Sequence, residues 1–258
     1  MSPSFLDLSE EFQGRRAVVT GGSRGIGAAV AQRLIDGGAE VVVTARTATD
    51  DTPKEATFIA ADLRTADGVR AFADSALRHL GGADIVVNNA AAVRAHLGGT
   101  TSIPDSEWLD SFEINLMAAV RVSNAFIPAL KESGSAVIIN VSAVGNRPPA
   151  SPMTHYGALK AALNAYSASL AQELAPSRIR VNTVTPGGVI TPGGDEVRQV
   201  MLDVLGVPAE ALFQQMIPLG RPGQAWEIAE TVAYLASDRA SWVTGANYFI
   251  DGGMQILA

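Results

Sequence analysis

The chain has 258 residues, of which 47% are hydrophobic and 17% charged, so it can build a substantial core and is not disordered. Its formal net charge of -7 argues against nucleic acid as a partner, because nucleic-acid binding needs a concentrated basic face. The absence of cysteine excludes disulfides, thiolate metal sites and cysteine nucleophiles. Any polyphosphate ligand must therefore find positive charge locally.

Metal and membrane binding are not expected from the sequence. The three histidines, His79, His96 and His155, form no close pair along the chain, so we expect surface or loop positions for them and no metal site. Residues 1–16 lack a basic segment followed by an apolar run, and no stretch approaches the ~20 apolar residues of a membrane span. We expect a cytoplasmic protein with no membrane partner.

Short β-branched segments alternate with longer helical patterns, which is typical of a parallel sheet covered by helices on both faces. The predicted strands are Ala17–Thr20, Glu40–Ala45, Thr57–Ala61, Asp84–Asn88, Ala136–Val141, Arg180–Thr185 and Asn247–Ile250. The predicted helices are Gly25–Asp36, Ala66–Leu80, Ser106–Lys131, His155–Leu174 and Trp226–Ala236. The expected fold class is α/β, a single-domain Rossmann-type doubly wound parallel sheet of about seven strands over residues 1–258.

The alternation of strands and helices stops between Gly187 and Gly223, where glycine and proline are frequent. A long irregular segment within a compact domain is uncommon and often functional, so residues 188–222 are expected to form a mobile lid over the substrate. The alternative is a lid helix packed on its own core. An apolar substrate is indicated by the side chains of Val200, Met201, Val204, Leu205, Leu212, Phe213 and Met216.

A glycine-rich turn, Thr20–Gly27, joins the first strand to the first helix. Glycines allow a tight turn and let backbone N–H groups approach a pyrophosphate, and the helix N-terminus adds partial positive charge. The spacing is T-G-x-x-x-G-x-G rather than the commoner G-x-G-x-x-G. The turn predicts a dinucleotide site with the contacts Gly21, Ser23, Arg24, Gly25, Ile26 and Gly27.

Five sequence blocks follow one another across nearly the whole chain. They are Thr20–Gly27, Asn88-Asn89-Ala90-Ala91, Asn115, Ser142 with Tyr156-Gly157-Ala158-Leu159-Lys160, and Pro186-Gly187. In this order they resemble the short-chain dehydrogenase/reductase family, in particular its single-domain branch of ketoreductases similar to 3-oxoacyl-carrier-protein reductases. Ala91 replaces a usual glycine and Ala143 a frequent serine, and neither position carries a catalytic group.

The resemblance implies an enzyme that moves a hydride between a nicotinamide and a carbonyl or secondary alcohol, with Tyr156 as general acid and base. Tyr156 and Lys160 are four residues apart, so they share one helix face. Lowering a tyrosine pKa from ~10 to near neutrality takes roughly 4 kcal/mol, which the Lys160 ammonium and the oxidised nicotinamide can supply. Ser142 can donate to the carbonyl oxygen. The family implies that Asn115 holds a water linked to Lys160.

Matching positions in the family also imply the remaining contacts with the cofactor. Asp62 and Leu63 would lie at the adenine and Asn89 and Ala90 near its ribose, whereas Tyr156 and Lys160 would meet the nicotinamide ribose. The segment at the carboxamide contains Pro186, Gly187, Val189 and Thr191. Asn182, by contrast, is expected to tie strands together rather than to touch the ligand.

The end of the second predicted strand favours NADP(H) over NAD(H). An NAD-specific site needs a carboxylate there to accept both ribose hydroxyls, and that position is Ala45. Arg46 follows it, and Arg24 lies in the glycine turn on the same side. Two guanidiniums can bind a 2′-phosphate through charge-assisted, often bidentate hydrogen bonds.

Two further expectations concern the class of protein and its assembly. A non-catalytic dinucleotide-binding regulatory protein is the alternative to an enzyme, but its usual sign is loss of the tyrosine or the lysine, and both are present. Members of this branch are commonly tetramers. A homotetramer is therefore expected, joined by the helices Ser106–Lys131 and His155–Leu174 and by the last helix and strand.

Overall fold

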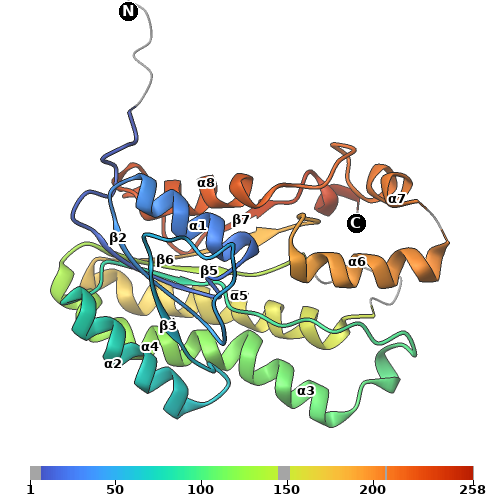
Figure 1. The fold of residues 1–258 in the computed structure, drawn as a ribbon, viewed down its shortest axis with the longest axis horizontal. Coiled ribbons are helices and arrows are strands. Elements are labelled where there is room, and N and C mark those ends of the chain that lie inside the picture. Colours follow the sequence, from blue (N-terminus) through green and yellow to red (C-terminus); the bar gives the residue numbers. More distant parts are fainter. Residues whose placement is uncertain (1–6, 145–151, 207, 258) are drawn as a thin grey trace, which may run out of the picture.

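The computed structural model describes residues 7–144, 152–206 and 208–257, which form one seven-stranded sheet with helices around it (Figure 1). All strand pairs are parallel, and the order is β3-β2-β1-β4-β5-β6-β7. The strands are β1 (Arg16–Thr20), β2 (Glu40–Ala45), β3 (Thr57–Ala60), β4 (Ile85–Asn88), β5 (Ala136–Val141), β6 (Ile179–Pro186) and β7 (Asn247–Ile250). This topology confirms the predicted Rossmann-type α/β class.

Helices cover both faces of the sheet. The helices are α1 (Gly25–Asp36), α2 (Ala66–Leu80), α3 (Asp105–Phe112), α4 (Ala118–Ser133), α5 (Thr154–Leu174), α6 (Pro192–Leu205), α7 (Ala209–Met216) and α8 (Ala225–Ala236). Figure 1 shows α1 and α8 on one face and α2, α4 and α5 on the other. Among the described residues, no helix has both the length and the apolar character needed to cross a membrane.

Alternate residues of each central strand supply two separate cores. Val18 of β1 packs with Phe72 of α2 and Phe126 of α4. Its neighbour Val19 packs with Leu34 of α1 and with residues of α8. Because successive side chains of a strand point to opposite faces, strands covered on both sides must be apolar throughout. That requirement explains the continuous apolar runs of β2, β4 and β5.

The strand order reverses between β1 and β4, and ligands of open α/β sheets bind beyond the carboxyl ends of the strands at such a point. The two strand ends are tied together there. Thr20 Oγ1 accepts hydrogen bonds from the backbone N–H groups of Asn89 and Ala90, each at 3.0 Å. The topology therefore sets the glycine turn beside the residues that follow β4.

The predicted helix Ser106–Lys131 contains a π-helical segment, Glu113–Met117, between α3 and α4. There the Ala118 N–H donates to the carbonyl of Glu113, five residues back. The extra residue rotates the helix locally, and such segments often occur at functional sites. The segment contains Asn115, one of the predicted catalytic residues.

The expectation of an irregular segment between Gly187 and Gly223 is wrong, because the chain forms α6 and α7 there. Several of the prolines and glycines that indicated a loop stand at helix ends. Pro192 is in the first turn of α6, and Thr191 caps that helix by accepting a hydrogen bond from Gly194 N. Gly206, in the left-handed conformation, ends it, and Pro208 precedes α7.

Candidate active site

The glycine turn brings the backbone of three segments into close contact. A Cβ atom on Gly27 would lie 2.2 Å from the Gly21 carbonyl oxygen, so any larger residue would force the turn open. Gly21 has φ +66°, and its N–H donates to Thr44 O at 2.7 Å. Asn89 Nδ2 donates to Gly21 O at 3.2 Å. The turn is thereby held close to the N-terminus of α1, as binding of a pyrophosphate requires.

The loop after β2 is hydrogen-bonded to this turn, and each of the two segments carries one of the predicted phosphate ligands. Thr49 Oγ1 donates to Ser23 O at 2.5 Å. Arg24, at the N-cap of α1, and Arg46, directly after β2, are both exposed. Within the described parts of the chain, neither guanidinium has a hydrogen bond or an ion pair to another residue. Both charges are therefore available to a ligand.

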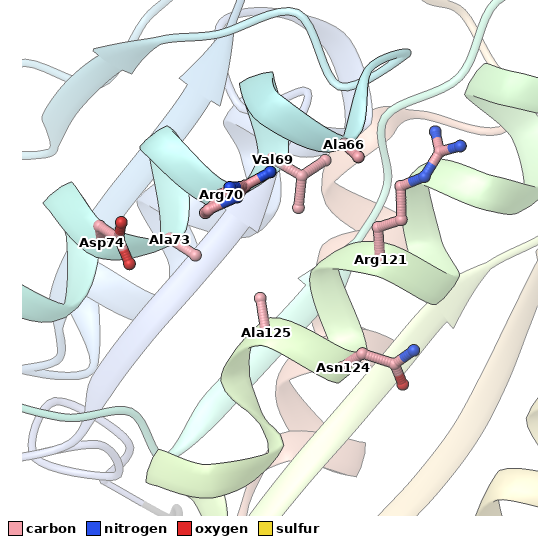
Figure 2. Close-up of a pocket in the computed structure, with 8 residues that line it drawn as sticks. All are labelled: Ala66, Val69, Arg70, Ala73, Asp74, Arg121, Asn124 and Ala125. Atoms are coloured by element: carbon pink, nitrogen blue, oxygen red, sulfur yellow. The ribbon is translucent and has the colours of Figure 1, made fainter.

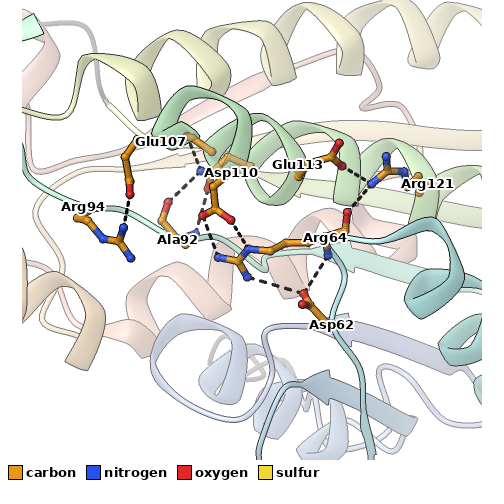
Figure 3. Close-up of polar contacts among 10 residues, drawn as sticks. Asp62, Arg64, Ala92, Arg94, Glu107, Asp110, Glu113 and Arg121 are labelled. Atoms are coloured by element: carbon orange, nitrogen blue, oxygen red, sulfur yellow. Dashed lines mark hydrogen bonds and ion pairs between the residues drawn. The ribbon is translucent and has the colours of Figure 1, made fainter. Parts of the chain in front are cut away.

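Asp62, the predicted adenine contact, is exposed in the loop after β3, and ion pairs tie this loop to α3 (Figure 3). Arg64 N donates to Asp62 Oδ1 at 3.1 Å, and Arg64 Nε donates to Asp110 Oδ1 at 2.6 Å. The Arg64 hydrogen bond lowers the pKa of Asp110, and the charge of Arg46 contributes to the same shift. The Leu63 side chain is buried in the core, so only its backbone can face a ligand.

The predicted catalytic residues gather beyond the carboxyl end of β5. Ser142 directly follows β5, and its Oγ donates to Lys160 O at 3.2 Å. Lys160 is buried on α5, and its Nζ donates to Val141 O at 2.8 Å. The same Nζ lies 5.7 Å from the centre of the Tyr156 ring. The structure thus brings the serine, the tyrosine and the lysine to one place.

Burial shifts the pKa of both titrating groups toward their neutral forms. It raises the pKa of Tyr156 to about 12 and lowers the pKa of Lys160 to about 8. The downward shift expected for the tyrosine is therefore not produced by the protein alone. At neutral pH Tyr156 is a phenol with a proton to give, and Lys160 is mostly protonated.

Asn115 is buried on the π-helical segment, and its side chain clamps the segment after β4. Its Nδ2 donates to Ala92 O at 2.9 Å and to Ser111 Oγ at 3.0 Å, and its Oδ1 accepts from Ala92 N at 3.1 Å. Both amide donors are used, so the implied contact with a water falls to the other polar atoms of the residue. Asn182 ties strand β6 to residues 243–246, as predicted.

The segment after β6 passes back to the glycine turn. Gly187, after Pro186, donates its N–H to Ile250 O of β7 at 3.0 Å, and Val189 forms a parallel bridge with Gly223. A Cβ atom on Gly25 would lie 3.3 Å from Thr191 Cβ. The two ends of the predicted cofactor site, far apart in the sequence, are thus in contact.

The buried position of His155 on helix α5 corrects the expectation of a surface or loop position, whereas His96 lies in a loop as predicted. His155 is only 2% exposed, and its ring lies edge-on to that of His96 with the centroids 5.2 Å apart. Glu107 of α3 completes the cluster. The sequence holds no signal for this group, because its members come from different segments and no short spacing connects them.

A groove between α2 and α4 is separate from the candidate active site (Figure 2). It contains none of the predicted site residues. Its lining consists of Ala66, Val69, Arg70, Ala73, Asp74, Arg121, Asn124 and Ala125.

The sheet is parallel and has a glycine turn where its strand order reverses. A serine, a tyrosine and a lysine lie together beyond the end of β5. This combination defines a dinucleotide-dependent oxidoreductase. The comparisons with known proteins agree. The family model described as "Enoyl-(Acyl carrier protein) reductase" matches residues 21–255. The chain belongs to the short-chain dehydrogenase/reductase family.

Similar proteins match over almost their full length. The 3-oxoacyl-[acyl-carrier-protein] reductase FabG of Pseudomonas aeruginosa is 38% identical over 251 residues, covering 94% of this chain and 98% of that protein. FabG of Escherichia coli K12 is 34% identical, covering 95% and 99% respectively. The structure of L-sorbose reductase from Gluconobacter frateurii, complexed with NADPH and L-sorbose, has a TM-score of 0.86 at 30% identity, covering 95% of this chain and 98% of that one.

Proposed function

We propose that this protein is an NADPH-dependent ketoreductase in which Tyr156 donates the proton that converts a carbonyl to a secondary alcohol. The observation that carries the proposal is the placement of Tyr156 and Lys160, four residues apart on α5, beside Ser142 at the end of β5. A regulatory protein that only binds dinucleotide would have no need of this group. Consumption of NADPH in the presence of ketones directly tests whether the protein is an enzyme or only binds dinucleotide.

The glycine turn and the exposed arginines fit a dinucleotide phosphate. Gly27 lets the turn pack directly against the start of α1, and the N-terminus of α1 carries no acidic residue in its first turn. When bound, NADPH supplies the hydride. Arg24 and Arg46 would hold its 2′-phosphate, Asp62 its adenine, and Lys160 its nicotinamide ribose.

The residues of the chain account for the proton and for the charge on the carbonyl oxygen. Tyr156, protonated at neutral pH, gives its proton to that oxygen as negative charge develops there. The Ser142 hydroxyl, which now donates to Lys160 O, turns to donate to the same oxygen. The Lys160 ammonium then stabilises the phenolate left on Tyr156.

Preference for NADPH over NADH rests on Ala45 and the two arginines. No carboxylate stands at the end of β2 to accept the ribose hydroxyls of NADH. Arg46 directly follows that position and Arg24 lies in the glycine turn, and neither guanidinium pairs with another residue that the structure describes. L-sorbose reductase, a structural relative, was solved with NADPH.

An apolar 3-oxoacyl thioester or similar ketone is the proposed substrate class, with residues 188–222 as the lid that covers it. Within this segment, Ile190 and Met216 are exposed and Leu212 is buried. Side chains of Met201, Val204 and Leu205 lie outside the described part of the structure. The FabG relatives are named for 3-oxoacyl substrates and the sorbose reductase for a sugar.

Initial rates of NADPH oxidation separate these substrate classes. Short 3-oxoacyl thioesters and bulky apolar ketones should be reduced far faster than L-sorbose, because desolvating sugar hydroxyls under an apolar lid is costly. Faster reduction of the sugar would reject the apolar lid but leave the hydride chemistry standing.

We further propose that the enzyme is a cytoplasmic homotetramer.

A further inference from the structure

The cluster formed by His96, Glu107 and His155 has the geometry of a metal site. One ligand atom of each side chain lies within 4.8 Å of the other two. His96 Nε2 is 3.7 Å from Glu107 Oε2. Zinc held tetrahedrally at ~2.0–2.1 Å sets its ligand atoms roughly 3.4 Å apart, so small side-chain rotations would close the site.

Two ring nitrogens of this cluster, one on each histidine, have no hydrogen-bond partner among the described residues. His96 Nε2 and His155 Nδ1 are buried and have no hydrogen bond to any described residue. Leaving two buried nitrogens unsatisfied is costly, and such atoms call for an explanation. The His155 side chain is almost completely buried, so solvent does not readily supply the missing partner.

One carboxylate oxygen of Glu107 remains available to a metal ion. Arg94 pairs with Oε1 of Glu107 (Figure 3). The other carboxylate oxygen, Oε2, is the one that lies near His96 Nε2.

We propose that His96, Glu107 and His155 bind one divalent transition metal ion, of the zinc class, with water as the fourth ligand. Two histidines and one glutamate are an established ligand set for zinc. The ion would connect the segment after β4, helix α3 and the first turn of α5. Because Tyr156 is next to His155 on α5, the site would stabilise the helix that carries the proposed proton donor without taking part in its chemistry.

The protein offers a matched control for nonspecific binding. His79 Nε2 lies 3.6 Å from Glu40 Oε1, almost the same distance as in the proposed site, but both side chains are substantially exposed. Among the described residues, no third histidine or carboxylate completes a group with them. A surface histidine–carboxylate pair should bind zinc weakly. Replacing His79 therefore removes a histidine without touching the site.

Calorimetric titration of chelator-treated full-length protein with ZnCl2 tests the proposal. We expect one ion per chain, and affinity at least about a hundredfold weaker in His96→Gln and in Glu107→Gln, since even loss of an outer-shell partner costs 10–100-fold. His79→Gln should bind like the wild type. Zinc should also raise the melting temperature of the wild type and of His79→Gln, but not that of the other two variants.

Equal zinc affinity in wild type and His96→Gln, or loss of binding in His79→Gln, would overturn the site. If His96→Gln does not fold, Co2+ added to the wild type decides the question. One equivalent should produce the intense visible absorption of tetrahedral Co2+. The weak spectrum of hydrated Co2+ would reject the proposal. Neither readout depends on reductase activity, so the proposed function stands or falls separately.

Discussion

Tyr156 is the proposed proton donor, and its replacement tests the chemistry most directly. Tyr156→Phe keeps the ring and removes only the hydroxyl, so the packing of α5 should survive. Turnover should fall by at least about a hundredfold, the usual scale of general acid–base catalysis. NADPH affinity, measured by fluorescence titration, should change only a few-fold. Turnover close to that of the wild type would rule out this proton donor.

Arg46 is the residue on which the proposed cofactor preference depends. Loss of one charge-assisted contact with the 2′-phosphate should cost about 1.5–3 kcal/mol, or roughly ten- to a hundredfold in affinity. Arg46→Ala should raise KM for NADPH by that factor and leave KM for NADH almost unchanged. Steady-state kinetics with both cofactors provide the measurement.

Arg70 is a suitable control for Arg46, because it is an exposed arginine on α2 that pairs with Asp67. Arg70→Ala alters the net charge equally but should leave both KM values unchanged. An equal increase in KM for NADPH and for NADH in Arg46→Ala would show that the arginine does not bind the 2′-phosphate. A wild-type preference for NADH would also contradict the proposed cofactor preference.

At the scale of elements, an ion pair joins the start of β1 to the residue before β4. Arg16 donates to Asp84 from its backbone N at 2.8 Å and from Nε and Nη2 at 2.9 Å each. Burial of the carboxylate works against ionisation, but these hydrogen bonds prevail and lower the pKa of Asp84 to about 2. Asp84 is therefore ionised in the folded state at every pH above that value.

This shift predicts how stability depends on pH. The pKa of Asp84 in the folded protein lies below the ordinary 3.8. The ionised carboxylate therefore contributes fully to the free energy of unfolding above pH 3.8, and this contribution is lost as pH falls through about 2. The pH-dependent part amounts to about 2.5 kcal/mol at most, of which about 1 kcal/mol should be gone at pH 3. Urea unfolding of wild type and Asp84→Asn at pH 7 and pH 3 should show the gap between them narrowing by that amount.

Asp238 provides the comparison for Asp84, since it is an exposed carboxylate 3.8 Å from Arg15. Asp238→Asn should have little effect at either pH, because exposed ion pairs contribute little. A stability gap between wild type and Asp84→Asn that stays constant from pH 7 to pH 3 would contradict the assignment of the pKa shift to this ion pair.

How far the sequence predicts an element depends on whether its signal is local. The bounds of β2, β5, α1 and α2 agree with the prediction, because apolar runs and helix-terminal glycines mark them. The sequence pattern did not predict helices α6 and α7, because proline and glycine are frequent both in loops and at helix ends. The π-helical segment has no local pattern of its own. Its extra residue is seen only in the backbone hydrogen bonds.

The same distinction holds for the candidate site. Tyr156 and Lys160 lie on one helix, so their spacing predicts that they are neighbours. The contact of Thr191 with Gly25 and the pairing of His96 with His155 depend on how distant segments pack. No periodicity or spacing encodes such contacts. The resemblance to a family implied that Gly25 and Thr191 each touch the cofactor, and only the structure revealed the two contacts.

At the scale of the whole molecule, exposed apolar side chains in two regions of the chain support the proposed tetramer. The region from α8 to the C-terminal turn contains Trp226, Trp242, Phe249 and Ile256, with Trp242 99% exposed and Ile256 79% exposed. Helix α3 contains Leu109 and Phe112. Exposed apolar groups of this size are typical of interaction surfaces.

Two different self-complementary surfaces on one chain generate a closed tetramer, because each forms a two-fold interface and the two axes combine. Light scattering at micromolar concentration should therefore give four times the 26.8 kDa chain mass. Replacing Trp242 with glutamate should break one interface and leave dimers, since burying an unpaired charge is costly. Leu109→Glu should do the same at the other surface, and the double variant should be monomeric. A monomeric wild type would refute the assembly, whereas a tetramer that survives Trp242→Glu would show that this surface faces solvent and that another one joins the subunits.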